Sequence, residues 1–133
     1  MWLPVTSLYA ALCTVLYLGL AARVSQLRRS EGVGLGSGDR PDLQRAIRAH
    51  GNAAEFLPLA LLLLALMEIQ QFPAAWLYPI GAGIFLGRLL HAAGLNVSAG
   101  YSFGRFFGSL VTWGLLVGMG GALIWRSLAG LPT

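Results

Sequence analysis

Residues Arg45 to Pro58 read R-A-I-R-A-H-G-N-A-A-E-F-L-P, and the rest of the chain is organised around them. Four polar residues in this stretch are separated by steps of three, four and three: Arg45, Arg48, Asn52 and Glu55. This spacing places them on one face of an α-helix. Residues 59–67 are then apolar without a break. A polar stripe that runs into a lipid-compatible segment predicts a helix whose polar face meets a buried polar partner.

The composition is that of a membrane protein. Of the 133 residues, 56% are hydrophobic and 11% are charged, and the mean hydropathy is +0.69, well outside the balance of soluble domains. Because a helix needs about 20 apolar residues to cross a bilayer, the chain has room for about four spans. The sequence therefore predicts an all-α membrane protein, a single domain built as a bundle of four transmembrane helices.

The apolar segments and the breaks between them predict four spans, at about residues 2–22, 41–70, 74–97 and 103–128. The first is interpreted as a retained helix rather than a signal peptide, because basic residues follow it instead of preceding it. The glycine-rich residues 31–41 predict a flexible loop, with Asp39 as the N-cap of the second helix. That helix would be roughly 45 Å long, so its arginine-bearing end is expected outside a hydrocarbon layer of roughly 30 Å.

The arginines predict the orientation in the membrane. Four of them, Arg23, Arg28, Arg29 and Arg40, lie between the first and second spans, whereas no cation separates the second and third. The positive-inside tendency then places both termini on the non-cytoplasmic side, with the polar stripe and Arg105 near the cytoplasmic face. Because the arginines gather at span ends rather than on a face with stacking aromatics, we expect no nucleic-acid partner.

Two opposite charges are expected at the same depth in neighbouring antiparallel helices. Counted from the non-cytoplasmic boundary, Glu55 lies about 22 Å along the second helix and Arg88 about 18 Å along the third. A lone charge at that depth costs about 2.5 to 3.5 kcal/mol, which predicts a Glu55–Arg88 ion pair inside the bundle. We interpret this pair as ordering the bundle. Since His91 has no cysteine or carboxylate at metal-ligand spacing, we expect no metal.

These residues carry a family resemblance. The sequence resembles the MAPEG family, the membrane-associated proteins in eicosanoid and glutathione metabolism, in three segments. These are the stretch from Arg45 to Pro58, the later G-R-L-L-H ending at His91, and Arg105-Phe-Phe-Gly. The likeness covers nearly the whole chain and is greatest to small bacterial members. It implies a homotrimer in a bacterial inner membrane that binds glutathione as co-substrate between neighbouring subunits, near the cytoplasmic face.

The resemblance also assigns individual residues. Arg48, Asn52 and Glu55 match the glutathione-contacting stripe of the family, Arg28 matches an arginine that holds a glutathione carboxylate, and Arg105 matches the arginine beside the thiol. The residue chemistry fits, because arginine forks bind carboxylates and an acid or amide suits the amine. A free thiol has a pKa of about 8.5, and one cation about 4 Å away contributes roughly 4 kcal/mol, enough for Arg105 alone to hold a thiolate.

Departures from the eicosanoid-forming members favour a more general reaction. Gly51 and Phe56 stand where those members have arginine and tyrosine, and Leu95 stands where they carry a further tyrosine. His91 and Tyr101 are candidates for the vacant polar roles in the glutathione pocket. The resemblance then implies thiol transfer to hydrophobic, lipid-soluble electrophiles, or reduction of lipid hydroperoxides, with the second substrate arriving from the bilayer along the first and fourth spans.

Two other classes of function stay open at the level of sequence. The family includes a non-catalytic lipid-binding member, so a membrane scaffold that binds lipid or glutathione is the alternative to an enzyme. A small four-helix bundle is also compatible with transport. Glutathione dependence separates the first two classes, and movement of a solute into proteoliposomes would support the third.

Overall fold

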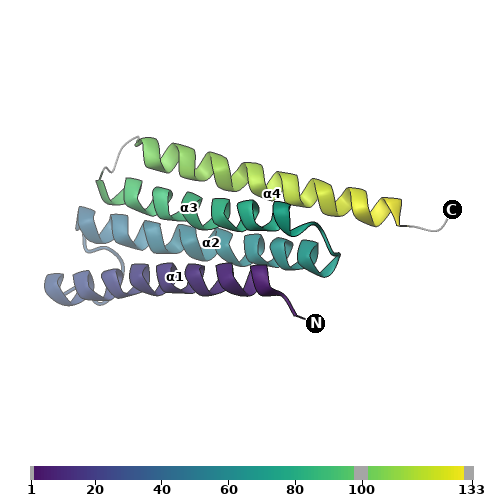
Figure 1. Cartoon of the computed structure of the whole chain (residues 1–133). Coiled ribbons are helices and arrows are strands. Elements are labelled where there is room, and N and C mark those ends of the chain that lie inside the picture. Colours follow the sequence, from purple (N-terminus) through teal and green to yellow (C-terminus); the bar gives the residue numbers. More distant parts are fainter. Residues whose placement is uncertain (1, 98–101, 131–133) are drawn as a thin grey trace.

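The computed structural model describes residues 2–97 and 102–130, and in these ranges it contains four helices and no strand. The helices are α1 (Pro4–Glu31), α2 (Pro41–Ile69), α3 (Ala74–Val97) and α4 (Phe103–Ala129). They run antiparallel to their neighbours in the chain and form one bundle (Figure 1). The predicted all-α helical bundle is confirmed.

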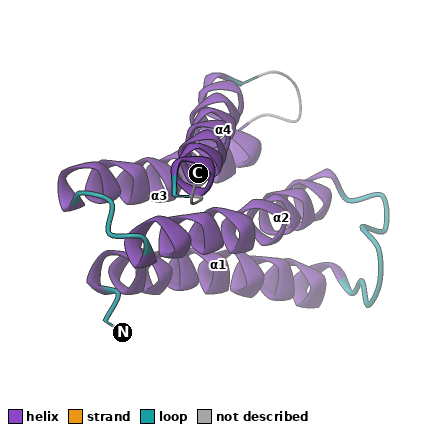
Figure 2. Cartoon of the chain, turned by 90° about the vertical axis from the view of Figure 1, so that its right-hand side faces the viewer, coloured by secondary structure: helices purple, strands orange, loops and turns teal. Residues whose placement is uncertain are grey.

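The pair α2 and α3 forms the centre of the bundle. Each of these helices packs against α1 and α4 and against the other, whereas α1 and α4 do not contact each other in the described parts of the chain. Figures 1 and 2 place α4 on the opposite side of α2 and α3 from α1. The start of α1 and the end of α4 lie at the same end of the bundle (Figure 1). Within the described chain, α1 and α4 are therefore separated by the central pair of helices.

The first helix is longer than predicted, because it continues nine residues past Ala22 to Glu31. Gly32 ends it in the left-handed region, at φ 66°. The Gly32 N–H donates to the Arg29 carbonyl (3.4 Å) and the Val33 N–H donates to the Arg28 carbonyl (3.0 Å), the paired bonds of a Schellman ending. Charged residues do not stop a helix in water, so the fall in hydropathy after Ala22 marked the end of the apolar stretch and not the end of α1.

The second helix begins where predicted, but not through the predicted cap. Arg40 is the N-cap residue and makes no capping hydrogen bond with its side chain. Asp39 has φ 57°, a left-handed turn conformation that asparagine and aspartate tolerate better than most residues. The predicted N-cap role of Asp39 is therefore wrong. Pro41 supplies the pre-set φ of the first turn, and its missing N–H costs nothing there.

Three of the described helices are long and apolar enough to cross a membrane: α1, α2 and α4. The remaining helix, α3, has 24 residues and includes the buried Arg88 and His91. Four helices are thus present as predicted, while length and composition support three spans directly. Because α3 packs against α2 and α4, Arg88 and His91 are buried in protein, which is where a membrane bundle places polar groups.

Glycines set how closely α3 approaches α4. A Cβ added to Gly108 would lie 2.5 Å from the Gly87 carbonyl oxygen and 2.7 Å from the His91 nitrogen. A Cβ added to Gly104 would lie 2.7 Å from the Leu90 carbonyl oxygen. The G-x-x-x-G pattern at 104 and 108 is therefore buried in the contact between α3 and α4, where backbone meets backbone.

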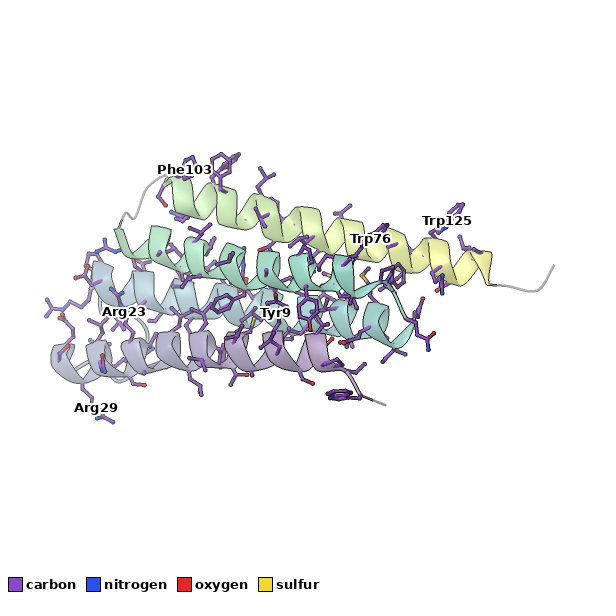
Figure 3. The ribbon with its side chains drawn as sticks, viewed as in Figure 1. Tyr9, Arg23, Arg29, Trp76, Phe103 and Trp125 are labelled. Carbon is purple, nitrogen blue, oxygen red and sulfur yellow. The ribbon has the colours of Figure 1, made fainter. Side chains whose placement is uncertain are left out.

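The two ends of the bundle differ in chemistry. Figure 3 shows Arg23, Arg29 and Phe103 toward one end, and Trp76 and Trp125 toward the other. Tyr9 lies between these ends, and its ring packs on Gly81 of α3, where an added Cβ would come within 2.0 Å of the ring. The arginine-rich end is also the end at which α4 begins, so Arg105 lies at the same end as the first residues of α2.

Candidate functional site

A polar cavity of about 300 Å³ opens at the arginine-rich end of the bundle. Three helices line it: α2 with Pro41, Gln44, Arg45, Arg48 and Asn52, α3 with His91 and Leu95, and α4 with Arg105. Four residues that the sequence assigned to a glutathione pocket therefore meet in one cavity: Arg48, Asn52, His91 and Arg105. Its wall carries three guanidinium groups and no carboxylate, so the cavity suits an anionic ligand.

The first turn of α4 positions Arg105. Ser102 is the N-cap of α4: its hydroxyl accepts from the Arg105 N–H (3.4 Å) and donates to the Gly94 carbonyl (3.1 Å). This hydroxyl thereby ties the start of α4 to the end of α3. The N-terminal end of a helix carries partial positive charge, so Arg105 and the backbone of α4 act on a bound anion in the same direction.

A second cavity, of about 450 Å³, adjoins the first. His91, Ser102, Arg105 and Ser109 form its polar part, and Phe106, Leu110 and Trp113 form its apolar part. His91 and Arg105 line both cavities. A charged group in the polar cavity and an apolar group in the second would therefore meet beside these two side chains. Such an arrangement suits a reaction between a polar thiol and a hydrophobic partner.

Arg88 does not lie in the polar cavity but directly behind it. Its side chain is 2% exposed and donates to three neutral acceptors: Nε to the Thr112 hydroxyl (3.0 Å), Nη2 to the Gly108 carbonyl (2.9 Å), and Nη1 to the Asn52 side-chain oxygen. The Arg88 guanidinium also lies over the Phe56 ring, 5.1 Å from its centroid. Arg88 thus links α2, α3 and α4 through a set of hydrogen bonds.

The predicted ion pair between Glu55 and Arg88 is not formed in the described chain. The ion pairs among the described residues are Arg40–Glu31 and Arg45–Asp42, and Glu55 is exposed. The prediction failed because the rise per residue fixes how deep a side chain lies but not which way its helix is turned. Asn52, almost one turn before Glu55, faces Arg88 and takes the role that the prediction gave to the acid.

The remaining predicted site residues lie elsewhere. Arg28 is at the end of α1, where Nη1 donates to the Val33 carbonyl (3.5 Å), beside a separate shallow cavity that Arg29 and Gly32 also line. Glu55 lines neither of the two cavities around Arg105. Tyr101 lies outside the described residues. A single chain therefore assembles the Arg48, Asn52, His91 and Arg105 part of the proposed pocket, without Arg28 or Glu55.

Two polar residues of this region were missed by the sequence prediction. Gln44 lies four residues before Arg48, so the helical spacing of the stripe could have included it. Thr112 is 0% exposed and donates its hydroxyl to the Gly108 carbonyl (2.9 Å), while it accepts from Arg88. A lone threonine in an apolar helix is common, so only the packing of α3 against α4 distinguishes it. Among the described residues, no group of His, Cys, Asp and Glu side chains is arranged to hold a metal ion.

Comparisons with known proteins identify the family of the chain. The family model described as the MAPEG family matches residues 6–125. The inner membrane protein YecN of Escherichia coli K12 is 36% identical over 92 residues, covering 69% of this chain and 70% of YecN, and the protein of the same name from E. coli O6:H1 matches equally well. No solved structure matches this chain.

Proposed function

Because this chain belongs to the MAPEG family of membrane proteins, we propose that it binds glutathione in the polar cavity and activates the glutathione thiol as a thiolate. The observation that carries the proposal is the convergence of Arg48, Asn52, His91 and Arg105, from three helices, on one cavity. Glutathione has two carboxylates, which suit the arginines, and its thiol would lie beside Arg105, where the two cavities meet.

Arg105 is the residue proposed to stabilise the thiolate. A cation about 4 Å from the sulfur contributes roughly 4 kcal/mol at an effective dielectric of 20. A shift of about two units in the thiol pKa, worth about 2.7 kcal/mol, makes the thiol mostly nucleophilic at neutral pH. The positive end of α4 adds to this effect because Arg105 lies in the first turn of that helix. The charge on the guanidinium is therefore sufficient to stabilise the thiolate, with the thiol proton released to water.

The second substrate is proposed to bind in the apolar cavity. Phe106, Leu110 and Trp113 are exposed on α4 and border the bundle surface, so a lipid-soluble molecule reaches them from the bilayer. In transfer, the thiolate sulfur attacks an electrophilic carbon and forms a C–S bond, while the bond to the leaving group breaks and that group departs with its electron pair. In peroxide reduction, it attacks the hydroperoxide oxygen to release an alcohol and form a sulfenic acid, which a second glutathione converts to glutathione disulfide and water.

A homotrimer in a bacterial inner membrane completes the proposal. Arg28 lies on α1, which does not contact α4 within the described chain, and it lines a different cavity from Arg105, so we propose that it joins the pocket from another copy. Assembly of three chains would bring Arg28 of the partner subunit to the cavity. The arginine-rich end of the bundle would face the cytoplasm and both termini the other side. The relative YecN is an inner membrane protein by name.

The deciding experiment is ultraviolet difference absorbance at the thiolate band, with purified detergent-solubilised protein titrated with glutathione. The wild type should give a saturable thiolate signal, and Arg105→Leu should lose it. Arg126→Leu is the matched control, because Arg126 lies at the opposite end of α4 and should leave the signal unchanged. Binding without a thiolate signal would favour a non-catalytic membrane scaffold, and an absence of binding would refute the glutathione site.

A further inference from the structure

The partners of Arg88 fix the orientation of the Asn52 amide. An arginine side chain carries only donors, so the atom that Asn52 turns toward Arg88 Nη1 must be its oxygen, Oδ1. The Asn52 nitrogen, with two N–H groups, then points away from Arg88. Asn52 also lines the polar cavity, so the nitrogen is the polar group that it has available for a ligand there. A free asparagine could offer either end, whereas this one offers a donor.

Arg88 itself is held in place by α4. Its Nε donates to the Thr112 hydroxyl, whose single hydrogen is donated to the Gly108 carbonyl, and its Nη2 donates to the same carbonyl. These bonds lie in the tightest part of the contact between α3 and α4, where Gly108 leaves no room for a Cβ. With Thr112 at 0% exposure and Arg88 at 2%, water does not compete for these groups. The guanidinium therefore has one orientation.

We propose that Arg88 is a positioning residue that turns the Asn52 amide nitrogen into the polar cavity, so that the site requires a hydrogen-bond acceptor there. In glutathione this acceptor would be a carboxylate or a peptide carbonyl, and the ligand's amine would be excluded from that position. Among the described residues, Arg88 contacts only neutral groups and the Phe56 ring. Its positive charge therefore also favours a carboxylate at this position. This inference rests on the proposed glutathione site.

The test is the affinity of the solubilised full-length Asn52→Asp variant for glutathione, measured by calorimetry beside the wild type. The aspartate keeps an acceptor for Arg88 and adds an ion pair, so its unfolding temperature should not fall. It removes the N–H donors and presents oxygen to the cavity, so affinity should fall by about 10- to 100-fold, as expected for a lost hydrogen bond to a charged group. If the amine occupied this position, the same change would strengthen binding and the inference would be overturned.

A second pair of variants tests the inference through Thr112, away from the cavity. Thr112→Ser keeps the hydroxyl that holds Arg88 and loses a methyl group, whereas Thr112→Val keeps the shape and loses the hydroxyl. A positioning role predicts that serine retains glutathione affinity and valine loses it by severalfold or more. A packing role predicts the reverse order. Thr14→Val is the control, because the Thr14 hydroxyl also donates to a helix carbonyl, that of Ala10, but lies on the exposed side of α1.

The outcomes separate this inference from the proposed function. If the wild type binds glutathione while Asn52→Asp binds it as tightly, only the orientation of Asn52 is refuted. If the wild type does not bind glutathione, the proposed function is refuted and the inference with it. A fall in affinity for Asn52→Asp and for Thr112→Val, with Thr112→Ser unaffected and the unfolding temperatures unchanged, supports both.

Discussion

Glu68 shows how a charged residue in this bundle is used for structure. It lies at the end of α2, and its carboxylate accepts from the backbone N–H groups of Val5 (2.9 Å) and Thr6 (2.7 Å). Those N–H groups belong to the first turn of α1, where no intrahelical acceptor exists. An acid from one helix therefore caps the start of another, at the positive end of its dipole. This contact joins α1 to α2 at the end of the bundle opposite the polar cavity.

Replacing Glu68 by glutamine should loosen this junction. Glutamine keeps one acceptor oxygen but loses the charge and the second acceptor, so one N–H of α1 is left without a partner. We expect a loss of about 1 to 3 kcal/mol in the free energy of unfolding, read as a lower midpoint in thermal unfolding followed by circular dichroism. Glu31→Gln removes a half-buried acid whose partner, Arg40, is exposed, and it should change the midpoint little. Equal midpoints for the two variants would contradict the capping role.

At the scale of elements, the contact between α3 and α4 decides the geometry of the site. Gly104 and Gly108 let the backbones of the two helices approach closely, and Arg88, Thr112 and His91 lie in or beside that contact. The same pattern recurs further along α4 at Gly114 and Gly118, where an added Cβ would meet nothing within 4 Å. One sequence motif thus has two different environments within the chain, and only the first is needed for the packing of α4.

Gly108→Ala should therefore lower the free energy of unfolding, whereas Gly118→Ala should raise it. The Cβ at position 108 would collide with backbone atoms of Gly87 and His91, which cannot move aside as a side chain would. We expect overpacking to lower the free energy of unfolding of Gly108→Ala by roughly 1 to 3 kcal/mol and to weaken glutathione binding. At position 118 alanine fits and favours the helix by roughly 1 kcal/mol. Thermal unfolding of both variants checks this, and a large loss at position 118 would show that another chain packs there.

At the scale of the whole molecule, the bundle divides its polar residues between two sides. The cavity around Arg105 lies between α2, α3 and α4, whereas Arg28 lies on α1, beyond α2 and α3. The proposed pocket is therefore incomplete in one chain. Large apolar side chains are exposed along α1 and α4, Val15 and Val117 among them, and these surfaces are available to lipid or to other copies. In the proposed homotrimer, the α1 of a partner chain would supply Arg28.

Native mass spectrometry of the protein in detergent should detect a species of three chains. Arg28→Leu should leave this assembly intact and lower glutathione affinity by about tenfold or more, because a carboxylate loses a charged donor. Arg29→Leu is the matched control, since Arg29 is the exposed neighbour of Arg28 in the same turn. If the wild-type protein were a single chain in detergent and still bound glutathione tightly, the shared pocket would be contradicted.

The amino-acid sequence determined the elements and their order. The third helix spans residues 74–97 as predicted, and the second and fourth end within one residue of their predicted limits. These features depend on local hydropathy, proline and glycine, which act along the chain. The spacing of Arg48 and Asn52 on one face was also readable, because the period of a helix is fixed. The tertiary structure brings both residues to His91 and Arg105, and their shared role in binding stays a prediction.

The tertiary structure alone decided which groups meet across helices. The rise per residue placed Glu55 and Arg88 at one level, but α2 is rotated so that Asn52, and not Glu55, accepts a hydrogen bond from Arg88. The closeness of α4 to α3 depends on the backbone contact between Gly87 and Gly108. The G-x-x-x-G pattern permits such a contact but does not say which glycines will make it, because the same pattern at Gly114 and Gly118 has open space. Periodicity fixes positions along one helix, whereas close packing between helices fixes their relative orientation, and with it the partners of every buried polar group.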